Sequence, residues 1–287
     1  MTPGVLAEAD EAAARAAKAA GVVVRELDHL DQLGAAITLF DKVWVPEDGG
    51  SSIRLDLLRA LTKAGNYASG AYDAASGELI GACVGFFGPP ARAELHSHVA
   101  GVLPAGLGRS VGFALKLHQR AWCLRHGATT IAWTYDPLIR RNAYFNLVKL
   151  GARPVEYLRN FYGVMDDQIN AGTETDRMLV HWDLLAGPDP GRAASFAAER
   201  ERGAVVVLAP GPGGRPAPAP EDAGRAGRLL VGVPADIESL RVSDPDAAAA
   251  WRTALRDALM PLVTSGSRVT GFDRDGWYVI ATERGTR

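Results

Sequence analysis

The chain has 287 residues, which is enough for two domains, and 47% of them are hydrophobic, as is usual for a soluble globular protein. Its formal net charge of −2 lacks the basic excess of a nucleic-acid-binding surface, so we expect no nucleic-acid partner. No run of about 18 apolar residues occurs, so we expect no membrane span. Residues 1–20 are rich in alanine and carry acidic side chains, which predicts a helix or a tail rather than a secretory signal.

Residues 21–185 are predicted to form one α/β domain. Short β-branched or alternating apolar runs indicate strands, and apolar residues three and four apart indicate helices. The predicted elements are, in chain order, strand 21–27, helix 28–44, helix 51–65, a hairpin over 66–88, strand 93–103, a turn and a helix ending near residue 126, strand 128–136, helix 140–152, and strands 154–165 and 176–185. Three consecutive strands precede the turn, which excludes a doubly wound dinucleotide domain.

The composition changes after residue 185. Residues 186–227 are rich in Pro, Gly and Ala and are predicted to be a flexible linker, although they contain one apolar run, "AVVVLAP". Residues 228–287 have the pattern of a β-α-β-β subdomain, which is small for an independent core and is expected to pack on the first domain. The predicted fold class is α/β (α+β), with a mixed, mostly antiparallel central sheet flanked by helices.

The turn before the helix that ends near residue 126 is rich in glycine. Gly106, Gly108 and Gly112 are spaced G-x-G-x-x-x-G, which is one residue longer than a dinucleotide-binding turn, and no Gly-Lys-Ser/Thr of a P-loop is present. A helix N-terminus with free N–H groups is nevertheless suited to bind a phosphate. The alternative is a strand-to-helix connection that binds nothing.

The order of elements, the strand end "VLP", the turn and the segment "RRNAYFNLVKLGA" resemble the GNAT superfamily of acyl-CoA-dependent N-acyltransferases over residues 21–185. The segments "HSHVAGVLP", "TETDRMLVHWDL" and "VTGFDRDGWYVI" are similar to a bacterial subgroup of predicted acetyltransferases, of which some are associated with N-succinylation of amino acids. The resemblance implies a GNAT-like fold. It also implies that acetyl-CoA or succinyl-CoA donates an acyl group to the primary amine of a small molecule, such as an amino acid.

The resemblance also implies which residues bind the donor. Backbone groups of the strand end would pair with the pantetheine arm, the turn would hold the pyrophosphate, and two helix residues would contact the arm; these residues are Ala100, Gly101, Val102, Leu107, Gly108, Arg109, Ser110, Val111, Gly112, Asn142 and Phe145. Leu107 replaces the family's Arg or Gln, and Ser110 replaces its first glycine. We expect Arg109, inside the turn, to compensate for the lost charge.

Candidate acid–base residues lie on the strand before the turn. Glu94, His96 and His98 alternate and therefore share one face of that strand. A histidine has a suitable pKa to accept a proton from an amine, whereas a polar strand face without chemistry is the alternative. The spacing supplies no third metal ligand, so we expect no metal.

The family's thiolate-protonating tyrosine corresponds to Leu147 here. Tyr144, three residues earlier on the same helix face, is a candidate replacement or else an ordinary half-buried aromatic residue. Glu94, Asp136 and Tyr162 are candidate substrate contacts. For Asp136 the alternative is a helix cap, and for Tyr162 a packed strand aromatic.

The thiols of Cys83 and Cys123 lie in apolar runs, and no CxxC pair is present, which favours buried free thiols and a cytoplasmic location. Two alternatives to a CoA-dependent enzyme remain open: a catalytically weakened GNAT-like binding protein, and an acyltransferase whose donor is an acyl carrier protein. A homodimer is also compatible with the sequence.

Overall fold

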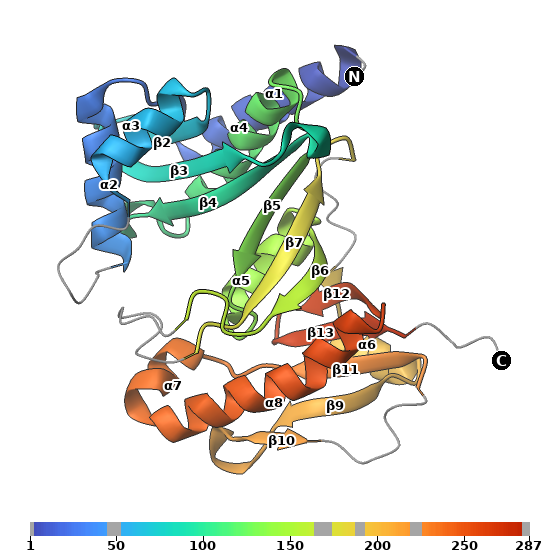
Figure 1. Ribbon diagram of the computed structural model, residues 1–287. Helices are drawn as coiled ribbons and strands as arrows, with labels where there is room; N and C mark the ends of the chain where they lie inside the picture. Colours follow the sequence, from blue (N-terminus) through green and yellow to red (C-terminus); the bar gives the residue numbers. More distant parts are fainter. Residues whose placement is uncertain (1–2, 45–52, 164–173, 187–192, 219–225, 283–287) are drawn as a thin grey trace. The chain divides into compact units, whose positions relative to one another are not determined.

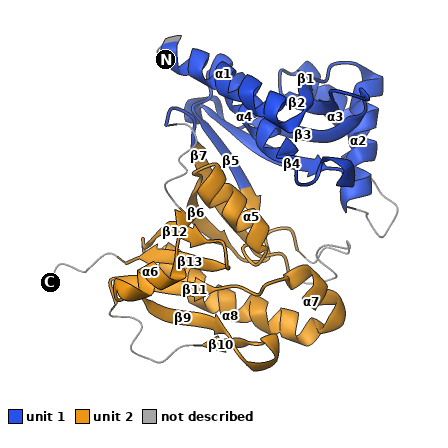
Figure 2. Ribbon diagram, turned by 180° about the vertical axis from the view of Figure 1, so that it is seen from behind, with its two compact units in different colours: residues 1–133, 183–187 blue, residues 134–182, 188–287 orange. Residues whose placement is uncertain are grey.

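The computed structural model describes residues 3–44, 53–163, 174–186, 193–218 and 226–282. It divides into two compact units (Figure 2). Unit 1 contains residues 1–133 and 183–187, and unit 2 contains residues 134–182 and 188–287. Residues 51–52 and 164–165, at the ends of a predicted helix and a predicted strand, lie outside the described residues.

Most of the predicted elements of residues 1–185 are present (Figure 1). They are α1 (Pro3–Ala20), β1 (Val22–Glu26), α2 (Leu30–Trp44), α3 (Leu55–Lys63), β2 (Tyr67–Asp73), β3 (Leu79–Phe87), β4 (Glu94–Val102), α4 (Val111–Arg125), β5 (Thr130–Tyr135), α5 (Arg140–Tyr144), β6 (Arg153–Leu158) and β7 (Arg177–Asp183). The strand order is β1-β2-β3-β4-β5-β7-β6. The pairs β1–β2, β2–β3, β3–β4 and β6–β7 are antiparallel, and β4–β5 is parallel. The predicted mixed α/β class is therefore confirmed.

In unit 1, helices cover both faces of the strands. The buried residues of α2, among them Leu33, Ile37 and Phe40 at helical spacing, pack against β2 and β3. On the other face α4 lies close to β3, and α1 lies alongside α4 (Figure 1). Glycines permit this approach, because a Cβ at Gly81 would lie 3.0 Å from the Val111 side chain.

Unit 2 contains a second sheet. Its elements are β8 (Ala193–Ala194), α6 (Phe196–Glu201), β9 (Val205–Pro210), β10 (Pro216–Pro218), β11 (Arg228–Gly232), α7 (Ile237–Ser243), α8 (Pro245–Thr264), β12 (Arg268–Asp273) and β13 (Trp277–Ala281). The strand order is β10-β9-β11-β13-β12-β8. On this sheet α8 buries one face that includes Trp251, Leu255 and Leu259.

The prediction of a linker over residues 186–227 is wrong for its described part. The apolar run of this range forms β9, which pairs in parallel with β11 and antiparallel with β10. Ser195 caps α6 by accepting a hydrogen bond from the Ala198 N–H. The prolines and glycines therefore mark short turns between strands, such as the one at Gly213 and Gly214, where φ is positive. Residues 187–192 and 219–225 of the predicted linker lie outside the described residues.

Within unit 2, the elements at 134–182 contact the second sheet. The Tyr278 hydroxyl donates a hydrogen bond to the Pro137 carbonyl at 2.8 Å and lies 3.3 Å from the Tyr135 hydroxyl. Tyr278 is fully buried. Among the described residues, no helix is both long enough and apolar enough to span a bilayer.

Candidate functional site

A bulge in β4 places the candidate histidines. Val84 of β3 pairs with Val99, but the next residue, Gly85, pairs with Ser97, so that His98 is an extra residue in β4. The bulge shifts the alternation of side chains. Before it, Ser97 faces α4, whereas after it Gly101 faces α2.

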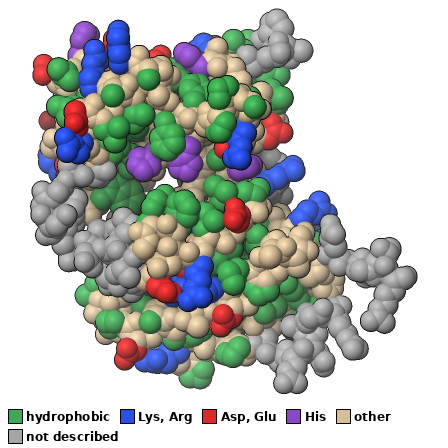
Figure 3. All heavy atoms as spheres, viewed as in Figure 1, with side chains coloured by type: hydrophobic (Ala, Val, Ile, Leu, Met, Phe, Trp, Pro, Cys, Tyr) green, Lys and Arg blue, Asp and Glu red, His purple; other side chains and the backbone are tan. Residues whose placement is uncertain are grey.

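His96 and His98 lie side by side on the face of β4 opposite Ser97. Their ring centroids are 6.4 Å apart, and each ring packs against Phe86, at 5.1 and 5.8 Å. Figure 3 shows several histidine side chains close to one another on one face of the molecule. Burial, then His98, then Lys116 lower the pKa of His96 to about 4, and burial lowers the pKa of His98. Glu94, half-buried, begins the same strand.

The edge of β4 that faces away from β3 is only partly paired. β4 pairs with β5 over Glu94–His96 and Thr130–Ala132. Within the described residues, no strand pairs with this edge of β4 from Ser97 to Val102, which includes the predicted donor-binding residues Ala100 and Gly101. An unpaired strand edge offers N–H and C=O groups to an extended ligand.

The glycine-rich turn follows this open edge directly. It consists of a 3₁₀ turn (Pro104–Gly106) and two left-handed residues, Gly108 (φ 76°) and Ser110 (φ 63°), before α4 begins. Among the described residues, the N–H groups of Gly108, Ser110, Val111 and Gly112 have no backbone partner. Such a run of free N–H groups at a helix N-terminus suits an anion.

Gly112 leaves room beside the turn. A Cβ at this position would meet only Val102 Cγ2, at an ordinary contact distance of 3.9 Å, so packing within unit 1 does not require glycine there. Gly106 differs, because its Cβ would lie 2.7 Å from the Val102 side chain. The turn residues thus fit a pyrophosphate through backbone groups.

Arg109 is engaged by contacts within unit 1. Its guanidinium forms an ion pair with Asp73 at 2.7 Å and donates to the carbonyls of Ala20 and Gly21 at 3.2 and 3.1 Å. Arg109 therefore ties the end of α1 and the β2–β3 hairpin to the turn. Leu107 is 67% exposed.

Three further candidates lie in unit 2, on α5 and the π-helical turn after it (Phe145–Lys149). Asn142 and Phe145 are half-buried there. The hydroxyl of Tyr144 lies 3.4 Å from the Arg274 guanidinium, which also packs over its ring. Leu147, the residue that the resemblance matches to a thiolate-protonating tyrosine, is 1% exposed.

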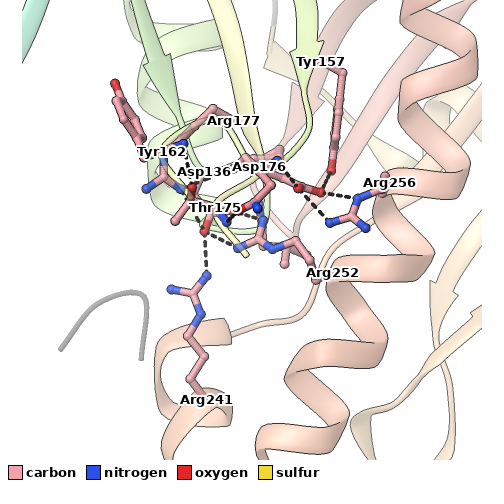
Figure 4. A network of polar contacts seen from close by, with 12 residues as sticks. Asp136, Tyr157, Tyr162, Thr175, Asp176, Arg177, Arg241, Arg252 and Arg256 are labelled. Carbon is pink, nitrogen blue, oxygen red and sulfur yellow. Dashed lines mark hydrogen bonds and ion pairs between the residues drawn. The ribbon is translucent and has the colours of Figure 1, made fainter. Parts of the chain in front are cut away.

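Asp136 is not available to a substrate ammonium. Its carboxylate is buried and accepts hydrogen bonds from Arg252 at 2.7 and 2.8 Å and from Arg241 at 2.6 Å, with Arg177 at 3.8 Å (Figure 4). These arginines hold the pKa of Asp136 below its ordinary value despite burial. It also accepts the Leu138 N–H, but α5 begins two residues later, so Asp136 is not its cap. The Asp136 carboxylate therefore lies at the centre of a buried cluster of ion pairs within unit 2.

The sequence predicted a strand at Tyr162, but Tyr162 does not lie in a strand. It follows the end of β6 in a turn, is 43% exposed, and its hydroxyl lies 3.2 Å from Thr134 Oγ1. The Arg177 guanidinium lies 5.5 Å from the centre of its ring. Tyr162 therefore remains an accessible candidate for substrate contact.

Sequence reasoning missed three buried charged side chains, one in unit 1 and two in unit 2. In unit 1, Lys116 is 4% exposed and bonded to Ser97 and Gln119. In unit 2, Arg252 and Arg256 bind Asp136 and Asp176 from α8. A signal was present, because both arginines fall on the face of α8 that also carries Trp251, Leu255 and Leu259.

Comparison with known proteins gives structural similarities only. No protein-family model matches the chain. No curated protein matches it in sequence. Among solved structures, part of the chain is similar to the ribosomal-protein-S18-alanine N-acetyltransferase of Escherichia coli, with 14% identity, a TM-score of 0.44, and coverage of 57% of this chain and 94% of the other.

Two other solved structures are similar to a comparable extent. One is a putative acetyltransferase from Salmonella typhimurium with its cofactor acetyl-CoA, with 14% identity, a TM-score of 0.45, and coverage of 57% and 93%. The other is a GCN5-related N-acetyltransferase from Kribbella flavida, with 16% identity, a TM-score of 0.43, and coverage of 57% and 98%. All three are described as N-acetyltransferases or as a putative acetyltransferase.

Proposed function

We propose that the chain is an N-acyltransferase that transfers an acetyl or succinyl group from a CoA thioester to the primary amine of a small molecule, such as an amino acid. The observation that carries the proposal is the open edge of β4 at Ser97–Val102, which leads into the turn with the free N–H groups of Gly108, Ser110, Val111 and Gly112. An extended pantetheine arm that ends in a pyrophosphate presents polar groups in the same order as this strand edge and turn.

In this proposal the backbone does most of the binding. The N–H groups at Gly108–Gly112 hold the pyrophosphate, and the edge at Ala100–Val102 holds the pantetheine arm. The bound thioester supplies an activated acyl carbonyl. His96 and His98 are the candidate bases, because both rings lie on one face of β4 and their lowered pKa values keep them neutral at pH 7.

The proton and bond changes balance as follows. The substrate ammonium gives one proton to a histidine, a C–N bond forms at the acyl carbon, and the C–S bond breaks. An amino acid's α-amino group has a pKa of about 8, so little help is needed for its deprotonation. The departing thiolate takes up a proton from solvent. A thiol pKa near 8.5 makes the thiolate a tolerable leaving group even without an acid from the protein.

Calorimetric titration with acetyl-CoA and succinyl-CoA, followed by thiol-release assays over a panel of amino acids and amines, tests the proposal. We expect binding of at least one thioester and turnover with at least one amine. Absence of binding at millimolar thioester would refute the donor site. Binding without turnover over the whole panel would favour a GNAT-like binding protein.

The base is tested separately. Replacing the responsible histidine by Gln should lower kcat by about 10²–10⁴-fold while leaving the Kd for the thioester unchanged. His126→Gln is the matched control, since His126 is exposed on the same unit and stacks on Trp122. Full activity in both His96→Gln and His98→Gln would exclude a histidine base.

One observation favours a second donor class. Arg109 is engaged internally and Leu107 is exposed, so these two residues give the pyrophosphate no charged side chain. An acyl carrier protein presents the same pantetheine arm without that pyrophosphate. A kcat/KM much higher for an acylated carrier than for the free CoA thioester would favour the carrier. The buried free thiols of Cys83 and Cys123 support a cytoplasmic location for either reaction.

A further inference from the structure

Unit 2 contains a hollow that the candidate functional site does not use. The hollow has a volume of about 400 Å³ and is lined by the start of β6, the end of α8 and the start of β12. Val155, Val263 and Val269 supply apolar lining, and Arg153 and Arg268 supply charge. Its volume falls within the range of small-molecule pockets. The hollow is therefore large enough for a small organic ligand.

The two arginines of the hollow differ from the other arginines of unit 2. Among the arginines that the structure describes in this unit, Arg153 and Arg268 alone form no hydrogen bond and no ion pair through the side chain. Each of the others contacts a carboxylate, a carbonyl oxygen or a tyrosine hydroxyl. Two guanidinium groups without an internal partner thus lie beside one hollow.

The charge of the lining is entirely positive. None of the described residues that line the hollow is acidic, and Glu156, which follows Val155 in the sequence, does not line it. A guanidinium group stays charged at every pH at which the protein is folded. Its forked donors match the oxygens of a carboxylate or a phosphate. The lining therefore favours a ligand with an anionic group.

Main-chain groups are also available at the hollow. β6 is the last strand of its sheet, and among the described residues the β12 edge opposite β13 is paired only at Phe272 and Asp273, with β8. Each of the two strands has a bulge, with Val155 and Thr270 as the extra residues, and both extra residues line the hollow. Bulges are frequent beside active sites, where they redirect a side chain or end the strand pairing. The bulges thus leave backbone polar groups near the two arginines.

We propose that this hollow is a binding site for a small organic molecule with an anionic group, a carboxylate or a phosphate. The anionic group accepts hydrogen bonds from Arg153 and Arg268, and the apolar part of the molecule contacts Val155 and Val263. The inference goes beyond the proposed function, because the residues of the hollow take no part in acyl transfer.

NMR titration of the full chain tests the inference with three probes: hexanoate, butyl phosphate and hexanamide. We expect at least one of the two anions to shift, in a saturable way, the backbone signals of residues 153–155 and 266–270 and the Nε–Hε signals of both arginines. Hexanamide has the same chain length as hexanoate but no charge and should not bind. The anion with the lower Kd identifies the ligand class as carboxylate or phosphate.

Variants of the lining separate a built site from surface attraction. Arg153→Gln and Arg268→Gln should each raise the Kd about tenfold or more, since one charge-assisted contact is lost. Arg215→Gln is the matched control, because it removes the same charge from an exposed arginine of unit 2 that pairs with Asp244. Its Kd should stay at the wild-type value. Val155→Phe keeps both arginines but narrows the hollow, so it should also weaken binding.

Three results would overturn the inference. One is the absence of saturable shifts with both anions at tens of millimolar. Another is an equal loss of binding in Arg215→Gln, which would mark an effect of net charge alone. The third is unchanged binding in Val155→Phe, which would place the anion on surface arginines outside the hollow. Because every readout is binding in unit 2, the result does not depend on whether the chain transfers an acyl group.

Discussion

Arg109 lies in the glycine-rich turn, but its side chain contacts other elements of unit 1. Its guanidinium joins the turn to Asp73 and to the carbonyls of Ala20 and Gly21, which only a forked donor can reach together. These contacts of Arg109 therefore stabilise the turn.

Arg109→Ala should accordingly affect stability rather than donor binding. We expect the free energy of unfolding to fall by about 1–2 kcal/mol, since a partly exposed ion pair and two hydrogen bonds are lost. The Kd for acetyl-CoA should change less than twofold. Urea unfolding and calorimetry measure the two quantities, and Arg109→Lys, which can keep the ion pair to Asp73 but not the fork, should fall between. A tenfold weaker Kd at unchanged stability would contradict this.

His118 links stability to pH. It lies 2.9 Å from the Tyr67 hydroxyl, and burial lowers its pKa to about 4. Below pH 6.5 the unfolded chain binds a proton that the folded chain excludes, so stability is present above pH 6.5 and is lost as the pH falls toward 4. For His118 the loss is on the order of 3 kcal/mol.

Urea unfolding of the wild type and of His118→Gln between pH 4 and 7 measures this effect. The variant should show a smaller loss of stability on acidification, and His96 accounts for part of the remainder. Parallel curves for the two proteins would show that His118 is not a source of the pH dependence.

At the scale of elements, the backbone is strained at the residue before α4, and that residue is not a glycine. Ser110 adopts φ 63° immediately before the helix, and its side chain makes no capping hydrogen bond. A residue with a Cβ pays for the left-handed conformation, whereas glycine does not.

Ser110→Gly should therefore raise the free energy of unfolding by about 0.5–1 kcal/mol, the relief being partly offset by the larger entropy of unfolded glycine. Ser110→Ala is the matched control, because it removes the hydroxyl and keeps the strain. Thermal and urea unfolding measure both. Equal stabilisation by Ala and Gly would show that the hydroxyl, not the backbone angle, is the source.

The elements most open to prediction were those with a periodic apolar pattern, such as α2 with Leu33, Ile37 and Phe40. The linker prediction failed because it gave the Pro, Gly and Ala content more weight than the β-branched run that forms β9. The bulge at His98 could not be predicted, because it depends on the pairing of β4 with β3. Lys116 was missed for a related reason: its burial depends on how close α4 comes to the glycines of β3.

At the scale of the whole molecule, buried ion pairs connect the elements of unit 2 with one another. Asp136 on the segment after β5 meets Arg241 of α7 and Arg252 of α8, while Asp176 meets Arg256 (Figure 4). Tyr157 of β6 donates to Asp176 at 2.8 Å. Segments far apart in the sequence thus depend on shared carboxylates.

Asp136→Asn should destabilise unit 2 by about 3–5 kcal/mol, because buried guanidinium groups lose their counter-charge. Glu238→Gln, which disrupts the more exposed pair with Arg141 in the same unit, should cost less than about 1 kcal/mol. Denaturant unfolding followed by tryptophan fluorescence compares them. Similar costs for the two variants would show that the Asp136 cluster contributes no more than a surface pair.

The open edge of β4 has a consequence for handling the protein. A strand edge with unsatisfied N–H and C=O groups is a template on which a strand of another molecule can add, and such addition begins aggregation. The bulge at His98 interrupts the regular spacing of that edge and shortens the stretch open to a foreign strand. A ligand lying along Ala100–Val102 would cover the rest, so an acyl donor bound there as proposed would also protect the folded chain from self-association during storage and concentration.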